Sequence, residues 1–303
     1  MPDVTAADLI DETQGLLQTF AQDSDQVTTL GADCAPTDLT VTVSTVRSGT
    51  LGLSPGVIEI GSELMFVTAI DQNSGVATVA PWGRGYLGTT ATSHSNGDRV
   101  TSQPTFPRHW VLNALNETIN RVFPEIFVPK VATLTTTVPK ITYDLPDDAD
   151  WVLDARWQPP TGTSYWQGVK RWRDSRGGTT VSGDPGVAVD VADVMTPGCP
   201  IEFTYAAAPV AFTDETSTYA STGLPDGVRD VLVLGAASAL TTSQELSRLQ
   251  TSSVEQQDRA HLVAPAAALT SSRFLEQKFQ LRLSEEVKSL RRKWPLRPQW
   301  SWV

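Results

Sequence analysis

Apolar side chains recur at every third or fourth position in four parts of the chain, which is the spacing of an amphipathic helix. The first of these parts opens with Thr5 and Asp8, a pairing typical of a helix start. The most regular stripe runs from Leu275 to Trp294, and a proline directly after it ends the helix. The sequence therefore predicts helices over residues 5–22, 108–123, 225–262 (with weaker periodicity after 244) and 272–294.

Two other regions alternate apolar and polar residues and are rich in β-branched residues and turn signals, which is typical of short antiparallel strands. The first covers residues 39–103, where Gly61-Ser62 separates two predicted strands. We expect this region to form a small barrel or sandwich. The second covers residues 131–212 and holds several tryptophans.

The β regions separate the predicted helices along the chain, and each helix has an apolar face that needs a partner. We therefore expect the helices to pack together as one bundle from which the β regions project. The predicted fold class is α+β: a discontinuous helical bundle carrying two inserted all-β lobes, with an extended C-terminal arm. The expected domains are residues 1–30, 105–130 and 223–294 for the three parts of the bundle, 31–104 and 131–222 for the two β insertions, and 295–303 for the tail.

Three glycines, Gly83, Gly85 and Gly88, have the G-x-G-x-x-G spacing of a dinucleotide-binding loop. Such a loop binds a pyrophosphate only where the last glycine opens a helix, whose N-terminal N–H groups then hold the phosphates. Here residues 89–98 have no apolar helical stripe and contain an Asn-Gly turn signal. We therefore expect the glycines to shape a β-turn, and we expect no cofactor.

The composition, with 40% hydrophobic and 19% charged residues among 303, is that of a globular protein large enough for two or three domains. The longest apolar stretch, residues 231–240, is shorter than the roughly 20 residues of a membrane span. The N-terminal residues do not resemble a signal peptide, so synthesis in a cytoplasm is expected. Cys34 and Cys199 are expected to be free thiols, although a disulfide between them is possible.

The net charge of −11 is unevenly distributed along the chain. Residues 273–298 carry a net charge of +5, and the rest of the chain carries −16. A basic segment on an acidic chain indicates a contact with an acidic protein surface or with nucleic acid. A solvated helix whose cations lie near the negative end of its dipole explains the same residues equally well.

The sequence contains no G-x-S-x-G, H-E-x-x-H, phosphate-loop or EF-hand pattern. The acidic cluster of Asp147, Asp148 and Asp150 follows a proline, which favours a solvated turn over a cation site. We expect no catalytic, cofactor-binding or metal site and no enzymatic activity. Four tryptophans of the second β region are expected to fill its core and sheet faces rather than to form a sugar-binding platform: Trp151, Trp157, Trp166 and Trp172.

The run V-I-E-I-G-S-E-L-M-F-V (57–67), followed by R-G-Y-L-G-T-T-A-T-S-H-S-N-G-D-R-V (84–100), resembles a β module that recurs in virion proteins of tailed bacteriophages. The order of helices and β insertions, ending in a long helix with a tail, resembles the head-to-tail adaptor (connector or neck) proteins of long-tailed double-stranded DNA phages. The low lysine content is similar to that of phages with high-GC, actinobacterial hosts. Because the two large β insertions depart from the shortest adaptors, another neck or tail-tip role stays open.

The resemblance implies a non-enzymatic structural protein of the virion neck, between capsid and tail, that is made in the bacterial host cytoplasm. It implies a ring of about twelve copies that binds the portal protein and the next neck or tail-terminator protein, without contact with a membrane. DNA would pass through the lumen without sequence-specific binding. The C-terminal helix and tail would bind the portal, because Trp and Arg are favoured interface anchors. The expected partner-binding residues are Arg282, Arg291, Arg292, Lys293, Trp294, Arg297, Trp300 and Trp302.

Two other functions also fit the sequence. A tail-tip, receptor-binding or carbohydrate-binding virion protein would use the Trp-rich residues 151–172. A DNA-binding protein would use the basic C-terminal helix, although the acidic total argues against it. A disordered terminus would explain the residues after 294 without a docking role.

Overall fold

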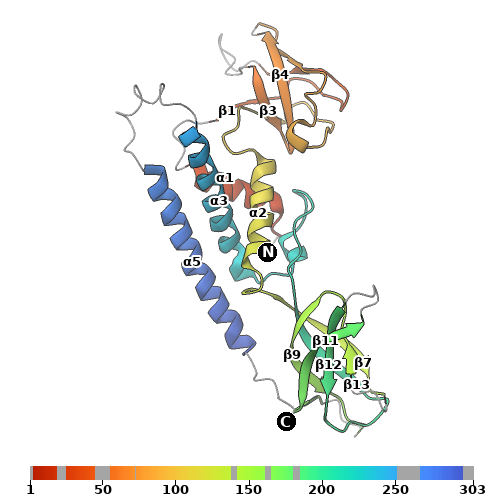
Figure 1. The fold of residues 1–303 in the computed structure, drawn as a ribbon. Coiled ribbons are helices and arrows are strands. Elements are labelled where there is room, and N and C mark those ends of the chain that lie inside the picture. The colour runs from red at the N-terminus through yellow and green to blue at the C-terminus, as the bar shows by residue number, and fades with distance from the viewer. Residues whose placement is uncertain are drawn as a thin grey trace. The chain divides into compact units, whose positions relative to one another are not determined.

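The computed structural model describes residues 3–18, 25–44, 55–71, 73–137, 142–160, 165–179, 185–250 and 267–295 (Figure 1). The chain divides into two compact units, each assembled from segments that are far apart in the sequence. The barrel unit combines residues 1–118, 212–218 and 231–279. The sandwich unit combines residues 119–211, 219–230 and 280–303.

A six-stranded antiparallel sheet with the order β1-β6-β3-β4-β5-β2 forms the β part of the barrel unit. Its strands are β1 (Gln26–Thr29), β2 (Thr40–Thr42), β3 (Gly56–Ile60), β4 (Glu63–Asp71), β5 (Val76–Val79) and β6 (Arg99–Ser102). The outer strands β1 and β2 also meet, because Leu30 forms a bridge with Val43 and the N–H of Ser44 donates to the carbonyl of Thr29 at 2.7 Å. The sheet thus closes into a small barrel. Closure pairs the edges of β1 and β2, whose backbone N–H and C=O groups would be exposed in an open sheet.

The strands of the barrel alternate between inward and outward side chains, as strand geometry requires. Ile58, Ile60, Met65 and Val67 are fully buried in the interior. Phe66 lies between two of these inward positions and therefore points to the outside of the barrel.

Four α-helices are present among the described residues: α1 (Ala6–Gln18), α2 (Arg108–Val122), α3 (Arg229–Gln250) and α5 (Ala267–Lys293). Helix α1 begins as its sequence predicts, because the Asp8 carboxylate accepts the Thr5 N–H at 2.8 Å. Inside the barrel unit, α3 approaches α2 and α5 at Gly235, where an added Cβ would clash with Thr118 and lie 2.9 Å from the Phe279 ring. None of the described helices is both long and apolar enough to cross a membrane.

The sandwich unit contains two antiparallel sheets. The first has the order β10-β9-β13-β7 and consists of β7 (Val128–Thr135), β9 (Ala149–Trp157), β10 (Gln167–Gly168) and β13 (Pro200–Ala207). The second has the order β11-β12-β8 and consists of β8 (Thr142–Asp144), β11 (Trp172–Thr179) and β12 (Pro185–Val191). Phe203 and Ala155 of the first sheet share one core with Tyr143 and Val189 of the second, so the sheets pack face to face.

The predicted fold class, a discontinuous helical bundle with two inserted all-β lobes and an extended arm, is wrong. The described residues form three antiparallel sheets and only four α-helices, and each compact unit is organised around β-sheet. The physical reason is that amphipathic spacing predicts a helix without identifying its partner. Residues of α2, α3 and α5 are shared between the two units instead of forming one separate bundle.

Candidate functional site

The predicted partner-binding residues that the structure describes lie on the C-terminal half of α5 or, for Trp294, directly after it, in the sandwich unit. Arg291, Arg292 and Lys293 are exposed in the last turn of the helix. Trp294 is half-buried and continues the helical hydrogen bonding, since its N–H donates to the carbonyl of Leu290 at 2.9 Å. Three further predicted residues lie outside the described residues: Arg297, Trp300 and Trp302.

The three cations form what we call the basic helix end: Arg291, Arg292 and Lys293. Among the described residues, none forms an ion pair with them. Their position at the helix C-terminus is favourable by itself, because the backbone dipole is negative there. Their charge is therefore available to an acidic partner at little cost in broken contacts.

Arg282 does not belong to the basic helix end. Its guanidinium binds Asp230 of α3 at 3.0 Å, Glu285 at 2.5 Å and Glu286 at 3.3 Å. The hydrogen bond that the Arg282 guanidinium donates to the Glu285 carboxylate is the main reason why the pKa of Arg282 is raised. The structure thus assigns Arg282 to the packing of α5 against the start of α3, and the prediction that it binds a partner has no support in its contacts.

The G-x-G-x-x-G run forms a tight turn on the outside of the barrel. The short 3₁₀ helix η1 (Tyr86–Gly88) is followed by non-helical residues, so no helix opens at the last glycine. Gly85 has φ +61°, and a Cβ there would lie 2.7 Å from the carbonyl oxygen of Thr89. The run forms a turn, as predicted, and Gly85 is needed there because the backbone of Thr89 approaches it closely.

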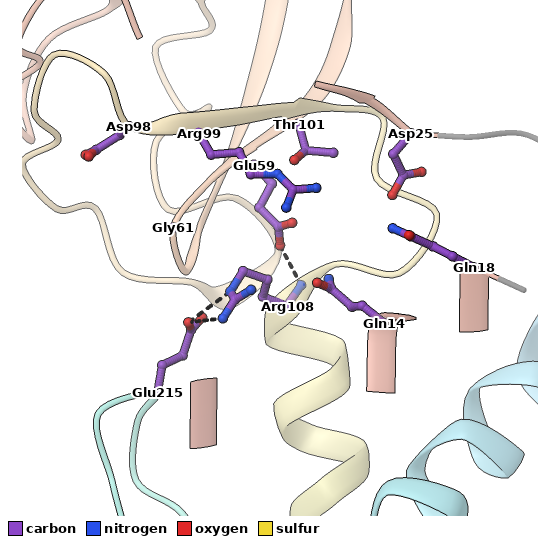
Figure 2. Close-up of a pocket in the computed structure, with 10 residues that line it drawn as sticks. All are labelled: Gln14, Gln18, Asp25, Glu59, Gly61, Asp98, Arg99, Thr101, Arg108 and Glu215. Atoms are coloured by element: carbon purple, nitrogen blue, oxygen red, sulfur yellow. Dashed lines mark hydrogen bonds and ion pairs between the residues drawn. The ribbon is translucent and has the colours of Figure 1, made fainter. Parts of the chain in front are cut away.

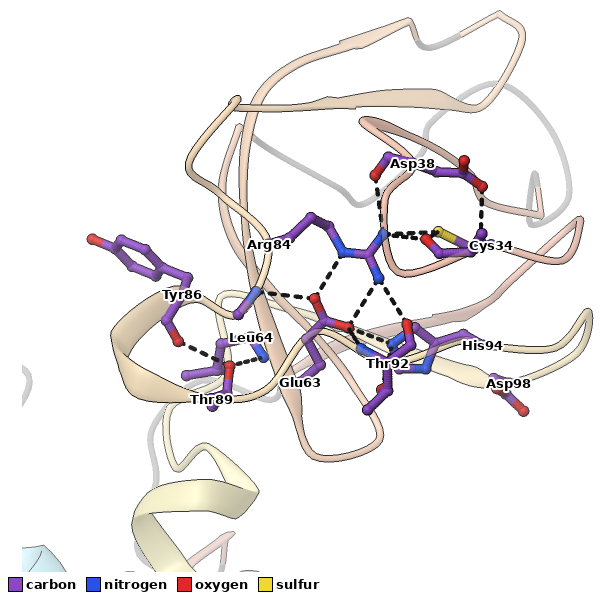
Figure 3. Close-up of polar contacts among 12 residues, drawn as sticks. Cys34, Asp38, Glu63, Leu64, Arg84, Tyr86, Thr89, Thr92, His94 and Asp98 are labelled. Carbon is purple, nitrogen blue, oxygen red and sulfur yellow. Dashed lines mark hydrogen bonds and ion pairs between the residues drawn. The ribbon is translucent and has the colours of Figure 1, made fainter.

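A fully buried carboxylate, Glu63, organises this turn (Figure 3). It accepts hydrogen bonds from Arg84 Nε at 2.8 Å, from His94 Nε2 at 2.8 Å, and from the backbone N–H groups of Gly85 at 3.0 Å and Thr92 at 2.9 Å. Burial alone would raise the pKa of Glu63, but these hydrogen bonds lower it to about 2. Glu63 is therefore a permanently charged anchor at neutral pH.

Arg84 extends the same network to a second loop. Its guanidinium donates to the carbonyl oxygens of Ala35 at 2.5 Å, Asp38 at 3.0 Å and Thr92 at 2.8 Å. The neighbouring thiol of Cys34 is buried, and this burial raises its pKa. Because the thiolate is the reactive form and the raised pKa disfavours it, we assign Cys34 a structural role. Cys34 and Cys199 are both free thiols, as predicted.

A cavity of about 350 Å³ in the barrel unit is lined by polar residues from the barrel, α1, α2 and the loop before residue 218 (Figure 2). Glu59 of β3 is buried there and accepts the N–H of Arg108, the first residue of α2, at 2.5 Å. Burial raises the pKa of Glu59 to about 7. The Arg108 side chain binds Glu215 at 2.8 Å and Asp11 at 2.5 Å, so this cation is paired with two carboxylates.

The tryptophans of the sandwich unit mostly pack into it. Trp151 lies against Phe123 and Phe127, with ring centroids 6.0 and 5.3 Å away, and Trp157 and Trp172 pack on the sandwich core. Trp166 is 36% exposed, and the Arg156 guanidinium lies 5.4 Å from its ring centroid.

Of the acidic cluster after strand β8, Asp147 and Asp148 lie in a turn, as expected, whereas Asp150 belongs to strand β9. The Asp148 carboxylate accepts hydrogen bonds from Lys130 Nζ at 2.7 Å and from the Tyr205 hydroxyl at 3.0 Å. In the part of the chain that the structure describes, no group of three or more His, Cys, Asp or Glu residues has a metal-binding arrangement.

One surface feature was missed from the sequence. Phe66, Trp82 and Tyr86 form an aromatic cluster on the outside of the barrel, and Trp82 is 62% exposed. The available signal was the alternation of β4, which places a large aromatic residue at an outward position beside an aromatic turn.

Comparison of the chain with protein-family models gives no match, and comparison with curated proteins gives no significant match. The function is therefore inferred from the residues and contacts described above.

Proposed function

We propose that this chain is a non-enzymatic structural protein of a tailed-phage virion, a head-to-tail adaptor. In this role it forms a ring between the portal protein and the next neck or tail-terminator protein, and DNA passes through the lumen. Its place is the virion neck, and the host is a high-GC, actinobacterial cell. The observation that carries the proposal is the exposed basic helix end on an acidic chain.

The basic helix end suits a docking contact with an acidic protein surface. Arg is over-represented among residues that dominate binding energies, and Trp294 directly follows the three cations. The cations need not break ion pairs with other described residues before they bind a partner. The acidic remainder of the chain is compatible with a DNA conduit, because like charge keeps phosphates from adhering to the wall.

The residues that carry the resemblance to phage virion proteins also have defined roles in the barrel, which supports a shared structural module. Arg84 and His94 bind the buried Glu63, and the Thr89 hydroxyl accepts the N–H of Leu64 at 3.1 Å. Val100 is fully buried in the barrel core. These residues therefore contribute to the fold of the barrel.

The test is a binding measurement between the full chain and the purified portal protein of the same phage. Replacing Arg291 and Arg292 by Glu should weaken binding at least about tenfold, because it turns attraction into like-charge repulsion. The control variant replaces Arg273 and Lys278, two exposed cations of the same helix, by Glu and should bind almost as wild type. Equal binding by wild type and the Arg291→Glu/Arg292→Glu variant would remove the support for this docking site.

A second candidate function, carbohydrate or receptor binding at the tail tip, has one observation in its favour. Tyr165 is 48% exposed beside the partly exposed Trp166, and Gln167 Nε2 donates to the Tyr165 hydroxyl at 2.7 Å. Exposed aromatic faces near amide groups are suited to sugar rings. Glycan-array binding that is lost in a Trp166→Ala variant would favour this function over the adaptor.

A further inference from the structure

The cavity in the barrel unit has a polar lining (Figure 2). Apart from Gly61, every described residue that lines it has a polar or charged side chain. Its volume of about 350 Å³ lies at the lower end of the range for small-molecule sites. Most such sites are lined mainly by apolar side chains, so this lining favours a small charged ligand over an apolar one.

Carboxylates outnumber cations around the cavity. The charged groups near Glu59 and its neighbour Arg108 come from α1, the start of the barrel, β6 and the loop before residue 218: Asp11, Asp25, Asp98, Arg99 and Glu215. The Arg108 guanidinium is already bound by Glu215 and Asp11, so Arg99 is the lining cation that forms no ion pair with a described residue. The cavity therefore attracts cations more than anions.

Two buried carboxylate oxygens in this cavity lack a hydrogen-bond donor. Glu59 is only 4% exposed, and its Oε1 accepts the N–H of Arg108 at 2.5 Å. No described residue donates to Glu59 Oε2 or forms an ion pair with this carboxylate. Glu215 Oε2 binds Arg108, whereas the buried Glu215 Oε1 has no hydrogen-bond partner among the described residues. Because buried acceptors are normally satisfied, this arrangement lacks a donor.

The electrostatics of Glu59 also favour an added positive charge. Burial is the main reason why its pKa is raised to about 7, and the negative charges of Glu215 and Asp25 raise it further. The N–H group and the charge of Arg108 lower this pKa only in part. A cation bound beside Glu59 would offset the cost of burying its ionised form.

We propose that this cavity binds a small organic cation through an alkylammonium or guanidinium group, with Glu59 and Glu215 as the acceptors. A metal ion is a poorer fit, because the acidic residues described here form no group of three or more in a metal-binding arrangement. An ammonium or guanidinium group needs acceptors at hydrogen-bond distance, which two carboxylates supply. This inference goes beyond the proposed function and does not depend on it.

The test is isothermal titration calorimetry of the full chain with agmatine, which carries a guanidinium and an ammonium group. The wild-type chain should bind it at pH 8 with a dissociation constant below about 1 mM. Glu59→Gln should weaken binding at least about tenfold, because it removes the charge of a buried acceptor. Circular dichroism and the thermal midpoint of this variant verify that it is folded.

Two further variants identify the sign of the ligand's charge and the place of binding. Arg99→Gln should bind agmatine more tightly, because it removes a lining cation that repels the ligand. A site for anions would respond in the opposite direction. Glu285→Gln removes a half-exposed carboxylate of α5 and should bind as wild type.

The pH dependence of binding gives an independent criterion. With a pKa of about 7, Glu59 is mostly ionised at pH 8. At pH 6 only about a tenth of it is ionised, so the affinity of the wild-type chain for agmatine should fall about tenfold between these values. Glu59→Gln should not show this fall, because Gln does not titrate.

A second probe, Nα-acetylarginine amide, distinguishes a free molecule from a side chain of another protein as the source of the cation. Binding of agmatine alone assigns the site to a free molecule, and binding of both probes extends it to an arginine side chain. The inference is overturned if wild type does not bind agmatine, if Glu59→Gln binds it equally well, or if magnesium chloride binds more tightly than agmatine. Portal binding is measured separately, so failure here leaves the adaptor proposal unchanged.

Discussion

Replacing Glu63 by Gln should destabilise the barrel unit severely. The substitution keeps the size of the side chain but removes the negative charge that pairs with Arg84, whose side chain is only 7% exposed. Removing one partner of a buried pair typically costs about 3 to 5 kcal/mol, because the remaining charge stays buried and uncompensated. The pKa of Glu63 gives a second route to the magnitude. Its lowering from 4.5 to about 2 corresponds to about 3 kcal/mol of native-state stabilisation at neutral pH.

The assay is urea unfolding followed by tryptophan fluorescence, at pH 7 and at several values down to pH 3. The pKa of Glu63 is lower in the folded than in the unfolded chain, so its contribution is complete above about pH 4.5 and is lost as the pH falls toward 2. The wild-type chain should therefore lose stability over this window, and the variant should lack this component. Glu285→Gln is the control, because Glu285 is 50% exposed and its ion pair with Arg282 is worth less than about 1 kcal/mol.

The reasoning is refuted if Glu63→Gln costs less than about 1 kcal/mol at pH 7. It is equally refuted if wild type and variant lose stability in parallel between pH 5 and pH 3, because Glu63 would then not titrate as its contacts require.

Three further predictions follow from single positions. Gly85→Ala should lower the thermal midpoint by several degrees in calorimetry, because its Cβ would lie 2.7 Å from the Thr89 carbonyl oxygen at a φ of +61°. Glu59→Gln should be more stable than wild type at pH 8 and similar to it at pH 4, as measured by urea unfolding. The pKa of Glu59 is about 7 in the folded chain and 4.5 in the unfolded chain, so the wild-type protein loses stability as the pH rises from 4.5 through 7, whereas the neutral Gln does not titrate. Gly235→Ala should destabilise the barrel unit by about 1 to 3 kcal/mol through overpacking against Thr118, and chemical denaturation measures this loss.

The individual elements were predictable because their periods are local. Helix α2 covers residues 108–122 where the sequence predicted 108–123, and β3 and β4 are separated at Gly61 as expected. The arrangement was not predictable, since the partner of an apolar face depends on segments far away in the chain. The assignment of α2, α3 and α5 to a single bundle failed for this reason.

The candidate sites also include features that the sequence predicted and features that only the structure shows. The exposed end of α5 could be read from its charge pattern, and the glycine turn from the absence of a helix after Gly88. The pairing of Arg282 with Asp230, 52 positions apart, required the fold. The partnership of Glu63 with Arg84 and the exposure of Trp82 likewise depend on how the turn folds back on the barrel.

The most direct test of the adaptor function is electron microscopy of the purified chain mixed with the portal protein encoded near it. We expect a ring of this chain on the portal, with the C-terminal end of α5 at the contact. A chain that leaves the portal bare, or a ring whose Arg291 and Arg292 face away from the portal, would contradict it.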